Sequence, residues 1–313
     1  MGHFLEMRNI TKLFSDNVVL KDIDFNADKG QVHALVGENG AGKTTLMKIL
    51  AGVHVANKGE IYIDGKKVEI NNPKEAQELG ISMIYQETRL FPDLNVAENI
   101  FIRREPLKKG LWLIDWDKVY SETAKYLDYF GLKINARASV NTLSLGQQKF
   151  VEIIKALSGN ARIIIMDEPT STLTDVETEH LFKIIRELKK EGVSVFYISH
   201  RFEEIRQIGD RVSVMRDGKI ICTESVSSMN ENNIIHMMTG LDLKDRYPKL
   251  TIKPGKEILS VTNLNVDNVL KNINFSLRRR EILGITGMVG SGRSKIAKSI
   301  FGIDKIDSGE IRI

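Results

Sequence analysis

Two patterns of apolar and polar positions recur along this chain of 313 residues. Continuous apolar runs, such as "VHALV" (32–36), "IIIM" (163–166) and "VSVFYI" (193–198), predict strands that are buried on both faces. Apolar residues spaced three or four apart predict helices. One helix, at 175–191, begins with acids, ends with bases and is followed by Gly192. Strands that alternate with helices predict an α/β fold.

The same patterns divide the first part of the chain. We expect residues 1–85 and 160–225 to form a core, with a mixed sheet flanked by helices. Residues about 88–158 are expected to form a mostly helical subdomain inserted into that core. We interpret its apolar stretches "LNVAENIFI" (94–102) and "GLWLIDW" (110–116) mainly as core packing.

Composition narrows the class of protein. The chain is 42% hydrophobic and 27% charged, with a net charge of +4, so it is an ordinary globular protein with no case for nucleic acid as its main partner. Its single cysteine, Cys222, excludes an internal disulfide and fits a reducing compartment. No signal peptide is visible, and the apolar runs are too short to span a bilayer. We expect a cytosolic chain that reaches a membrane only through a partner.

A glycine-rich motif follows the first buried run. The segment "GENGAGKTT" (37–45) fits the phosphate-loop pattern G-x-x-x-x-G-K-[ST], with a strand before it and a helical pattern after it. The glycines let backbone N–H groups curl around a phosphate, and the helix N-terminus adds partial positive charge. Lys43 is placed to reach the β- and γ-phosphates, and the Thr44 hydroxyl to ligate Mg²⁺. The motif therefore predicts nucleotide binding.

An internal repeat explains a second motif of this kind. Shifted by 250 positions, residues 20–63 align with residues 270–313 without a gap, and 13 of the 44 aligned positions are identical. "GMVGSGRS" (287–294) is thus the phosphate loop of a second copy, with Arg293 in place of lysine. The match stops at Ile313, so we expect only the beginning of a second domain, at 255–313. A linker at 241–254 would separate it from a first domain at 1–240.

The two copies differ upstream of the loop. The second copy has four residues fewer in the stretch that matches 11–19, so Phe14 has no counterpart. An aromatic face suits a purine ring, and we expect Phe14 to stack on adenine in the first copy; an ordinary core position is the alternative. Because Arg293 lacks the compact point charge of lysine, we expect the second loop to form a weak or slow site.

Four further signals follow in a fixed order. "ISMIYQE" (81–87) predicts a short strand that ends near Gln86, and "LSLGQQKFVEIIKAL" (143–157) predicts a small-residue turn followed by a helix. The run at 163–166 ends in two acids, Asp167 and Glu168, and the run at 193–198 leads to His200. Carboxylates at the C-terminal end of a buried parallel strand are typical of nucleotide sites in α/β proteins.

In this order the motifs resemble the nucleotide-binding domain of ABC-type ATPases. The resemblance implies a P-loop NTPase fold, with a mixed sheet core, an antiparallel β part and a helical subdomain. "LSLGQQ" and "DEPTSTLT" (167–174) are similar to the import ATPases of simple sugars, the ribose, galactose, xylose and arabinose group. In that group an aliphatic residue replaces a glycine of the more common LSGGQ, the chain carries two copies of the domain, and the second phosphate loop has Arg. Thr174 departs from the usual Asp, which puts communication between domains in doubt.

The resemblance implies a role for each motif. ATP phosphates would be bound by Lys43 and the loop backbone, Mg²⁺ would be held by Thr44, Gln86 and Asp167, Glu168 would polarise the attacking water, and His200 would contact the γ-phosphate. The segment "LSLGQ" (143–147), here called the signature segment, would act on the nucleotide of the opposite domain. The implied nucleotide contacts are Phe14, Gly37, Glu38, Asn39, Gly40, Ala41, Gly42, Lys43, Thr44, Thr45, Ser144, Gly146 and Gln147.

The resemblance also implies partners. In the family the helical insert docks the membrane subunit, so docking stays open as the alternative to core packing for residues 94–102 and 110–116. The chain would power import of a simple sugar from the cytoplasmic face of the cell membrane, with membrane permease subunits, a second nucleotide-binding domain or a homodimer, and indirectly a sugar-binding protein. Two alternatives stay open. One is a soluble ABC ATPase that acts on ribosomes or DNA, which usually carries charged helical insertions or C-x-x-C pairs not found here. The other is an ATP-binding module with negligible turnover.

Overall fold

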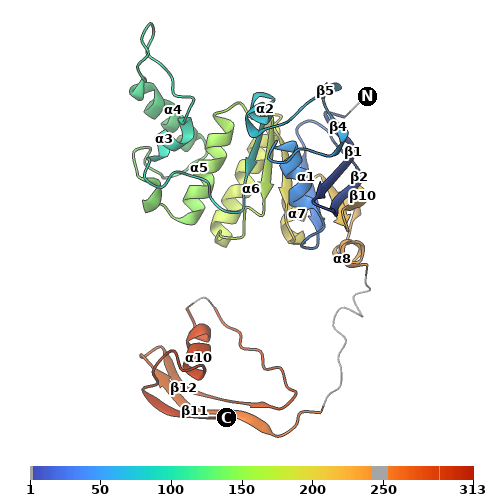
Figure 1. Ribbon diagram of the computed structural model, residues 1–313. Coiled ribbons are helices and arrows are strands. Elements are labelled where there is room, and N and C mark those ends of the chain that lie inside the picture. The colour runs from blue at the N-terminus through green and yellow to red at the C-terminus, as the bar shows by residue number, and fades with distance from the viewer. Residues whose placement is uncertain (1–2, 241–252, 289) are drawn as a thin grey trace. The chain divides into compact units, whose positions relative to one another are not determined.

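The computed structural model of the protein describes residues 3–240, 253–288 and 290–313 (Figure 1). The chain divides into two compact units, Met1–Arg246 and Tyr247–Ile313. The linker expected at 241–254 lies, except for its last two residues, outside the described residues. Within the described ranges, no helix is long and apolar enough to cross a bilayer.

A six-stranded sheet forms the centre of the first unit. The strands lie in the order β10-β9-β3-β8-β7-β6, and neighbours run parallel except for β10, which is antiparallel to β9. All residues of β3, β7 and β8 are buried, which explains why these strands read as continuous apolar runs. The bounds are β3 Val32–Gly37, β6 Ile81–Ile84, β7 Ile163–Asp167, β8 Ser194–Ile198, β9 Arg211–Arg216 and β10 Lys219–Ser225.

A second, antiparallel sheet belongs to the same unit. Its strands have the order β2-β1-β4-β5, with β1 Leu5–Phe14, β2 Asn17–Ala27, β4 Lys58–Ile63 and β5 Lys66–Val68. One core cluster joins this sheet to the central sheet through the first helix: Met7, Leu35, Leu46 and Leu50 belong to it and are at most 1% exposed. The predicted mixed sheet with an antiparallel part is confirmed.

The helices of the first unit complete its layers. A second core cluster contains Phe150 and Ile154 of α5, Leu181 and Ile185 of α6, and Ile164 of β7, so these two helices cover one face of the central sheet (Figure 1). The bounds are α1 Lys43–Leu50, α2 Pro73–Glu78, α3 Val96–Phe101, α4 Trp116–Tyr129, α5 Leu145–Leu157, α6 Asp175–Lys190, α7 Phe202–Ile208 and α8 Glu231–Thr239.

The two apolar stretches between β6 and α5 have different fates. Val96 and Ile100 of α3 are fully buried, as expected for core packing. The interpretation of residues 110–116 as core is wrong, because Trp112 is 96% exposed and Leu113 61% exposed. These side chains lie on a hairpin that extends away from α3 and α4, where no described element covers them (Figure 1).

The second unit repeats part of the first. A three-stranded antiparallel sheet has the order β12-β11-β13, with β11 Glu257–Val266, β12 Leu270–Arg278 and β13 Ser308–Arg312, and one helix, α10 Arg293–Ile300, accompanies it. Five buried residues form its small core: Val261, Leu264, Val266, Leu270 and Ile296. Residues 282–287 match β3 in the repeat, but they form no strand, and Ile282 is 99% exposed.

Candidate functional site

A tight loop connects β3 to α1. Its glycines have positive φ angles, 86° at Gly40 and 100° at Gly42, in the region that side chains avoid. A Cβ atom at Gly42 would also lie 2.6 Å from Cδ2 of Leu20, so glycine is needed there for space as well as for conformation. The loop therefore presents backbone N–H groups at the N-terminus of α1, the geometry that suits an anion.

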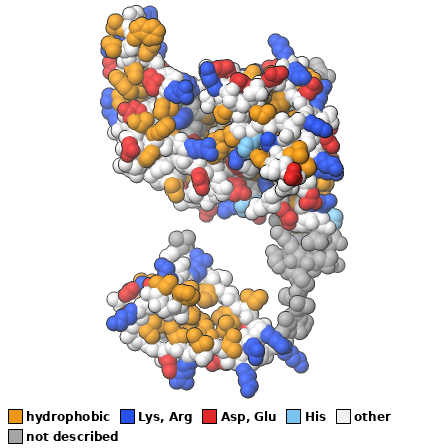
Figure 2. Space-filling model, viewed as in Figure 1, with side chains coloured by type: hydrophobic (Ala, Val, Ile, Leu, Met, Phe, Trp, Pro, Cys, Tyr) orange, Lys and Arg blue, Asp and Glu red, His pale blue; other side chains and the backbone are white. Residues whose placement is uncertain are grey.

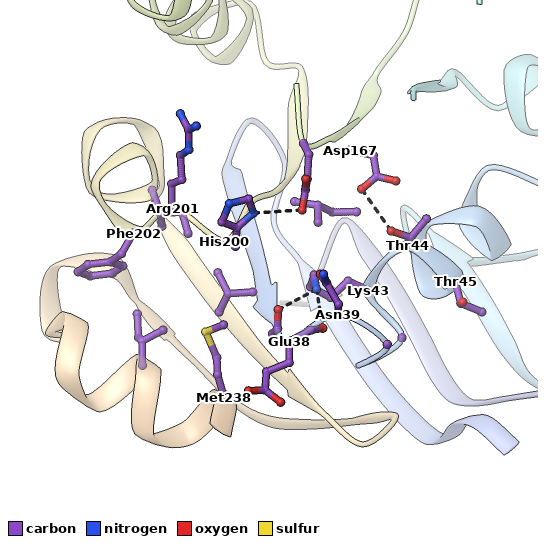
Figure 3. A pocket seen from close by; sticks show the side chains of 18 of the residues that line it. Glu38, Asn39, Lys43, Thr44, Thr45, Asp167, His200, Arg201, Phe202 and Met238 are labelled. Atoms are coloured by element: carbon purple, nitrogen blue, oxygen red, sulfur yellow. Dashed lines mark hydrogen bonds and ion pairs between the residues drawn. The ribbon is translucent and has the colours of Figure 1, made fainter. Parts of the chain in front are cut away.

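Lys43 is the first residue of α1, and its side chain turns back over the loop (Figure 3). Its Nζ donates hydrogen bonds to the carbonyl oxygens of Gly37, at 2.8 Å, and Glu38, at 2.9 Å. Only 8% of the residue is exposed. This burial lowers the pKa of Lys43, while the nearby carboxylates of Glu168 and Asp167 act in the opposite direction. The loop thus holds one cation where a phosphate would lie.

Asp167 faces the same loop from the end of β7. The Thr44 hydroxyl donates a hydrogen bond to its Oδ1 at 3.2 Å (Figure 3). Burial raises the pKa of Asp167, so a cation beside it would relieve the cost of its charge. Thr44, Asp167 and Gln86 line one cavity and offer hydroxyl, carboxylate and amide oxygens, the donors Mg²⁺ prefers. The described residues hold no cluster of three or more His, Cys, Asp or Glu suited to a metal. This donor set fits an ion that keeps water and phosphate ligands.

Glu168 joins two further elements. Its Oε1 lies 3.2 Å from Nδ1 of His200, which follows β8, and its Oε2 accepts a hydrogen bond from Nε2 of Gln86, which follows β6, at 3.4 Å. The backbone of Glu168 has a φ of 45° and donates to the Ile198 carbonyl at 3.0 Å. This turn holds the carboxylate between the glutamine and the histidine.

These residues line one cavity of about 1270 Å³. The loop forms one wall (Figure 3), and α8 adds an apolar side with Ile235 and Met238. No sequence motif indicated this contribution of α8. Sequence-predicted residues in the lining are Gly37, Glu38, Asn39, Gly40, Gly42, Lys43, Thr44, Thr45, Gln86, Asp167, Glu168 and His200. Ala41 is 5% exposed and lies in the loop behind this lining.

Phe14 lies outside that lining. It ends β1, is 40% exposed, and its ring packs edge-on against His54 with 5.1 Å between ring centroids. Asn17 and Val19 of β2 line the cavity instead. The contact expected between Phe14 and adenine stays a prediction.

The signature segment also lies apart from this cavity, at the N-terminus of α5. Ser144 caps the helix by accepting from the Gln147 N–H at 3.1 Å, and the Gln147 side chain accepts from the Ser144 N–H at 3.0 Å. A Cβ atom at Gly146 would collide with the carboxylate of Glu177, so a side chain there would force Glu177 to move. Glu177 also accepts from the N–H and the hydroxyl of Thr174, each at 2.9 Å. The sequence pattern of the helix that carries Glu177 did not indicate this contact.

A buried ion pair behind the site was also missed. Nζ of Lys149 lies 2.9 Å from Oε2 of Glu152 and donates to the carbonyl oxygens of Tyr85, at 2.7 Å, and Gln86, at 3.3 Å. Oε1 of Glu152 accepts from the Arg89 N–H at 2.6 Å. The pair therefore ties the helix of the signature segment to the backbone around Gln86. Its one sequence signal is a Lys and a Glu three apart in a largely apolar helix.

A third buried carboxylate supports the turn that carries His200. Glu204 of α7, 6% exposed, accepts hydrogen bonds from the hydroxyls of Thr170 at 2.8 Å, Tyr197 at 2.8 Å and Ser199 at 3.0 Å. Thr170 follows Glu168, and Ser199 precedes His200. One carboxylate thus links the loops after β7 and β8.

Comparison with known proteins agrees with this geometry. The profile of the ABC transporter family matches residues 20–171 and again residues 270–313. The chain belongs to the ABC transporter family. The predicted resemblance and the predicted fold class are confirmed. The double match also agrees with the internal repeat found in the sequence.

Members of the ABC transporter family with known roles are close in sequence. The galactose/methyl galactoside import ATP-binding protein of Clostridium perfringens is 48% identical over 311 residues, which are 99% of this chain and 60% of that protein. The xylose import ATP-binding protein of Thermoanaerobacter pseudethanolicus is 46% identical over 312 residues, 97% of this chain and 61% of that protein. The chain spans about three fifths of the length of these relatives.

Solved ABC structures share the fold. An ATP-binding cassette of an ABC transporter in its ADP conformation matches with a TM-score of 0.66 and 26% identity, covering 77% of this chain and all of that cassette. A dimeric ATP-binding cassette in a post-hydrolysis state with ADP and Pi matches with a TM-score of 0.61 and 26% identity, covering 71% of this chain and 98% of that one.

Proposed function

We propose that the chain binds and hydrolyses ATP as part of the ATP-binding subunit of a simple-sugar importer. The observation that carries the proposal is that Lys43, Thr44, Asp167, Glu168 and His200 line one cavity. Within it, Thr44 is hydrogen-bonded to Asp167, and His200 lies within hydrogen-bond distance of Glu168. Similar proteins are named as import ATP-binding proteins for galactose, ribose and xylose, which supports a simple sugar as the imported substrate.

Each residue has a role that its contacts suit. Phosphoryl transfer needs positioning and charge neutralisation more than covalent help. The loop N–H groups and Lys43 hold the β- and γ-phosphates, and Lys43 exchanges its carbonyl contacts for phosphate oxygens. Thr44, Gln86 and Asp167 hold Mg²⁺, which neutralises charge on the phosphates when bound. Glu168 orients the attacking water, and His200 holds Glu168 and contacts the γ-phosphate.

The signature segment serves a second nucleotide. Ser144, Gly146 and Gln147 do not line the cavity of Lys43, which supports action on a nucleotide held by another domain. We therefore propose that the first domain pairs with a second nucleotide-binding domain or with a second copy of itself. The dimeric cassette among the similar structures supports this arrangement.

Import requires further partners. We propose that membrane permease subunits dock this chain at the cytoplasmic face of the cell membrane, and that a sugar-binding protein outside delivers the sugar to them. The ATP-binding chain contacts that binding protein only indirectly. The relatives' description as import proteins supports this placement.

Binding and turnover measured on one sample test the proposal. The purified chain should bind Mg-ATP, and its phosphate release per chain should rise with protein concentration, because a complete site needs a second domain. Binding without release at any concentration would leave an ATP-binding module without turnover. Absence of ATP binding would overturn the proposal. Stimulation of release by vesicles carrying the permease and the matching sugar-binding protein tests the transport step.

A further inference from the structure

A short hairpin connects α3 to α4 and extends away from both (Figure 1). Its tip, residues 107–113, reads "LKKGLWL". Trp112 is 96% exposed, Leu113 61%, Leu111 54% and Leu107 50%. Trp116, just beyond the tip, is 41% exposed. Isolated apolar side chains on a surface are normal, but several on one projecting turn mark a contact surface.

Part of the backbone of this hairpin is hydrogen-bonded within the hairpin itself. Leu107 and Ile114 form an antiparallel bridge, and the N–H of Lys108 donates to the carbonyl of Leu113 at 2.9 Å. The N–H of Leu111 closes the turn on the carbonyl of Lys108 at 3.0 Å, and Gly110 supplies the φ of 73° that the turn requires. The tip therefore can enter an apolar medium without exposing these N–H groups to it.

The charges of the tip have one sign. Lys108 and Lys109 are exposed, and the tip contains no acid. Neither lysine forms an ion pair with any residue in the described ranges. Figure 2 shows apolar side chains gathered at the end of this projection, with basic side chains next to them. Two lysines beside Trp and Leu suit a surface that is apolar inside and negative outside.

We propose that the tip of residues 107–113 inserts into the interface of an anionic lipid membrane. Trp112 and the leucines would lie at the boundary of headgroups and acyl chains, where indole rings partition, and Lys108 and Lys109 would contact lipid phosphates. The projecting shape favours a fluid surface over a groove on a protein, since four apolar side chains of one turn are each at least half exposed. The proposal goes beyond ATP chemistry and does not depend on it.

The two tryptophans of the chain make a direct test possible. They are Trp112 and Trp116, so a Trp116→Phe variant keeps Trp112 as the only emitter. Phenylalanine preserves an aromatic ring beside Tyr120, whose centroid lies 6.1 Å from that of Trp116. The full chain with this change is mixed with phosphatidylcholine vesicles that contain or lack phosphatidylglycerol. With the anionic lipid, emission should move to shorter wavelength, and a lipid-borne quencher should reduce it.

Matched variants separate insertion from general attraction. Lys108→Gln with Lys109→Gln should weaken sedimentation with anionic vesicles about 30-fold, from about 1 kcal/mol for each lysine near the surface. The control, Lys58→Gln with Lys66→Gln on the antiparallel sheet, should change it little. Trp112→Ser should weaken it on the order of 10- to 100-fold, for loss of about half an indole surface from the interface.

Three outcomes would overturn the proposal. The first is unchanged Trp112 emission with anionic vesicles. The second is an equal loss of vesicle binding in the Lys58 and Lys66 control variant. The third is vesicle binding that the Trp112→Ser change does not weaken. A blue shift only with permease-containing vesicles, and not with lipid alone, would assign the tip to a protein partner instead. Melting temperatures of all variants should match the parent, because the side chains changed are exposed. Failure of ATP binding leaves these results unaffected, so the two proposals fail separately.

Discussion

The two phosphate loops of the chain have nearly the same backbone. The φ angles at the last two glycines are 86° and 100° in the first loop, and 85° and 90° in the second, and an eight-residue helix follows each loop. Their surroundings differ. The strand before the first loop, β3, is buried between β8 and β9, whereas residues 282–287 form no strand. Lys43 is buried, and Arg293 is exposed.

This difference separates what is local from what is not. The turn and the start of its helix follow from glycines and short-range hydrogen bonds, so both copies form them. The site depends on residues brought from β6, β7 and β8, more than forty positions away along the chain. A phosphate loop alone therefore predicts a local backbone conformation. It predicts a reaction only together with the residues that β6, β7 and β8 bring to it.

The largest expected effect concerns Glu168, which no described residue of the second unit matches. Glu168→Gln should slow ATP hydrolysis by about 10²- to 10⁴-fold, the usual range for a group that activates water, while ATP binding persists. Phosphate release, under conditions where the parent protein hydrolyses ATP, measures the rate. An ATP-binding measurement on the same variant measures the affinity. Loss of binding equal to the loss of rate would contradict the assignment.

The next effect concerns the support behind the first loop. Lys149→Met leaves the carboxylate of Glu152 buried without its cation, so the free energy of unfolding should fall by about 3–5 kcal/mol. Urea denaturation followed by circular dichroism measures it. Lys183→Met, an exposed change on α6, is the matched control and should stay within about 0.5 kcal/mol. A small change in the free energy of unfolding for Lys149→Met would mean that water solvates the Glu152 carboxylate in place of the lysine.

The two loops can be compared directly by replacing the basic side chain of each with alanine. Lys43→Ala should weaken ATP binding by about 2–3 kcal/mol, or about 30- to 150-fold in Kd, because a charge-assisted contact to phosphate is lost. Arg293→Ala should leave Kd unchanged. Titration calorimetry with Mg-ATP distinguishes the two variants. Equal losses would break the comparison, because they would make the second loop a binding site too.

The smallest expected effect concerns Phe14, which the second copy lacks. Phe14→Ala should raise the Kd for ATP by about 1 kcal/mol, near the lower end for loss of one stacking face, and Phe14→Tyr should be nearly silent. The same calorimetric titration measures it. An unchanged Kd with a lowered melting temperature would show that the ring serves its contact with His54 instead.

The sequence predicted the parts of the site that motifs encode. Lys43 and Thr44 are fixed by a local pattern, and Asp167 follows from an apolar run that ends in acids. The contacts by which Lys149, Glu177 and Glu204 hold the site could not be predicted from the sequence. Each of them includes a partner more than thirty positions away along the chain. The prediction for residues 110–116 failed because an apolar stretch favours burial but does not show which surface buries it. Within the described residues, no element covers Trp112 and Leu113.

The position of β3 in the central sheet has a consequence for synthesis of the chain. Its partners β8 and β9 end about 160 and 180 residues after it. At about 5–20 residues per second, β3 leaves the ribosome roughly 10–35 s before the second of them. During that time β3 has neither of its strand partners in the sheet, and closing so long a loop is slow. We expect nascent chains of this protein to bind chaperones in that interval.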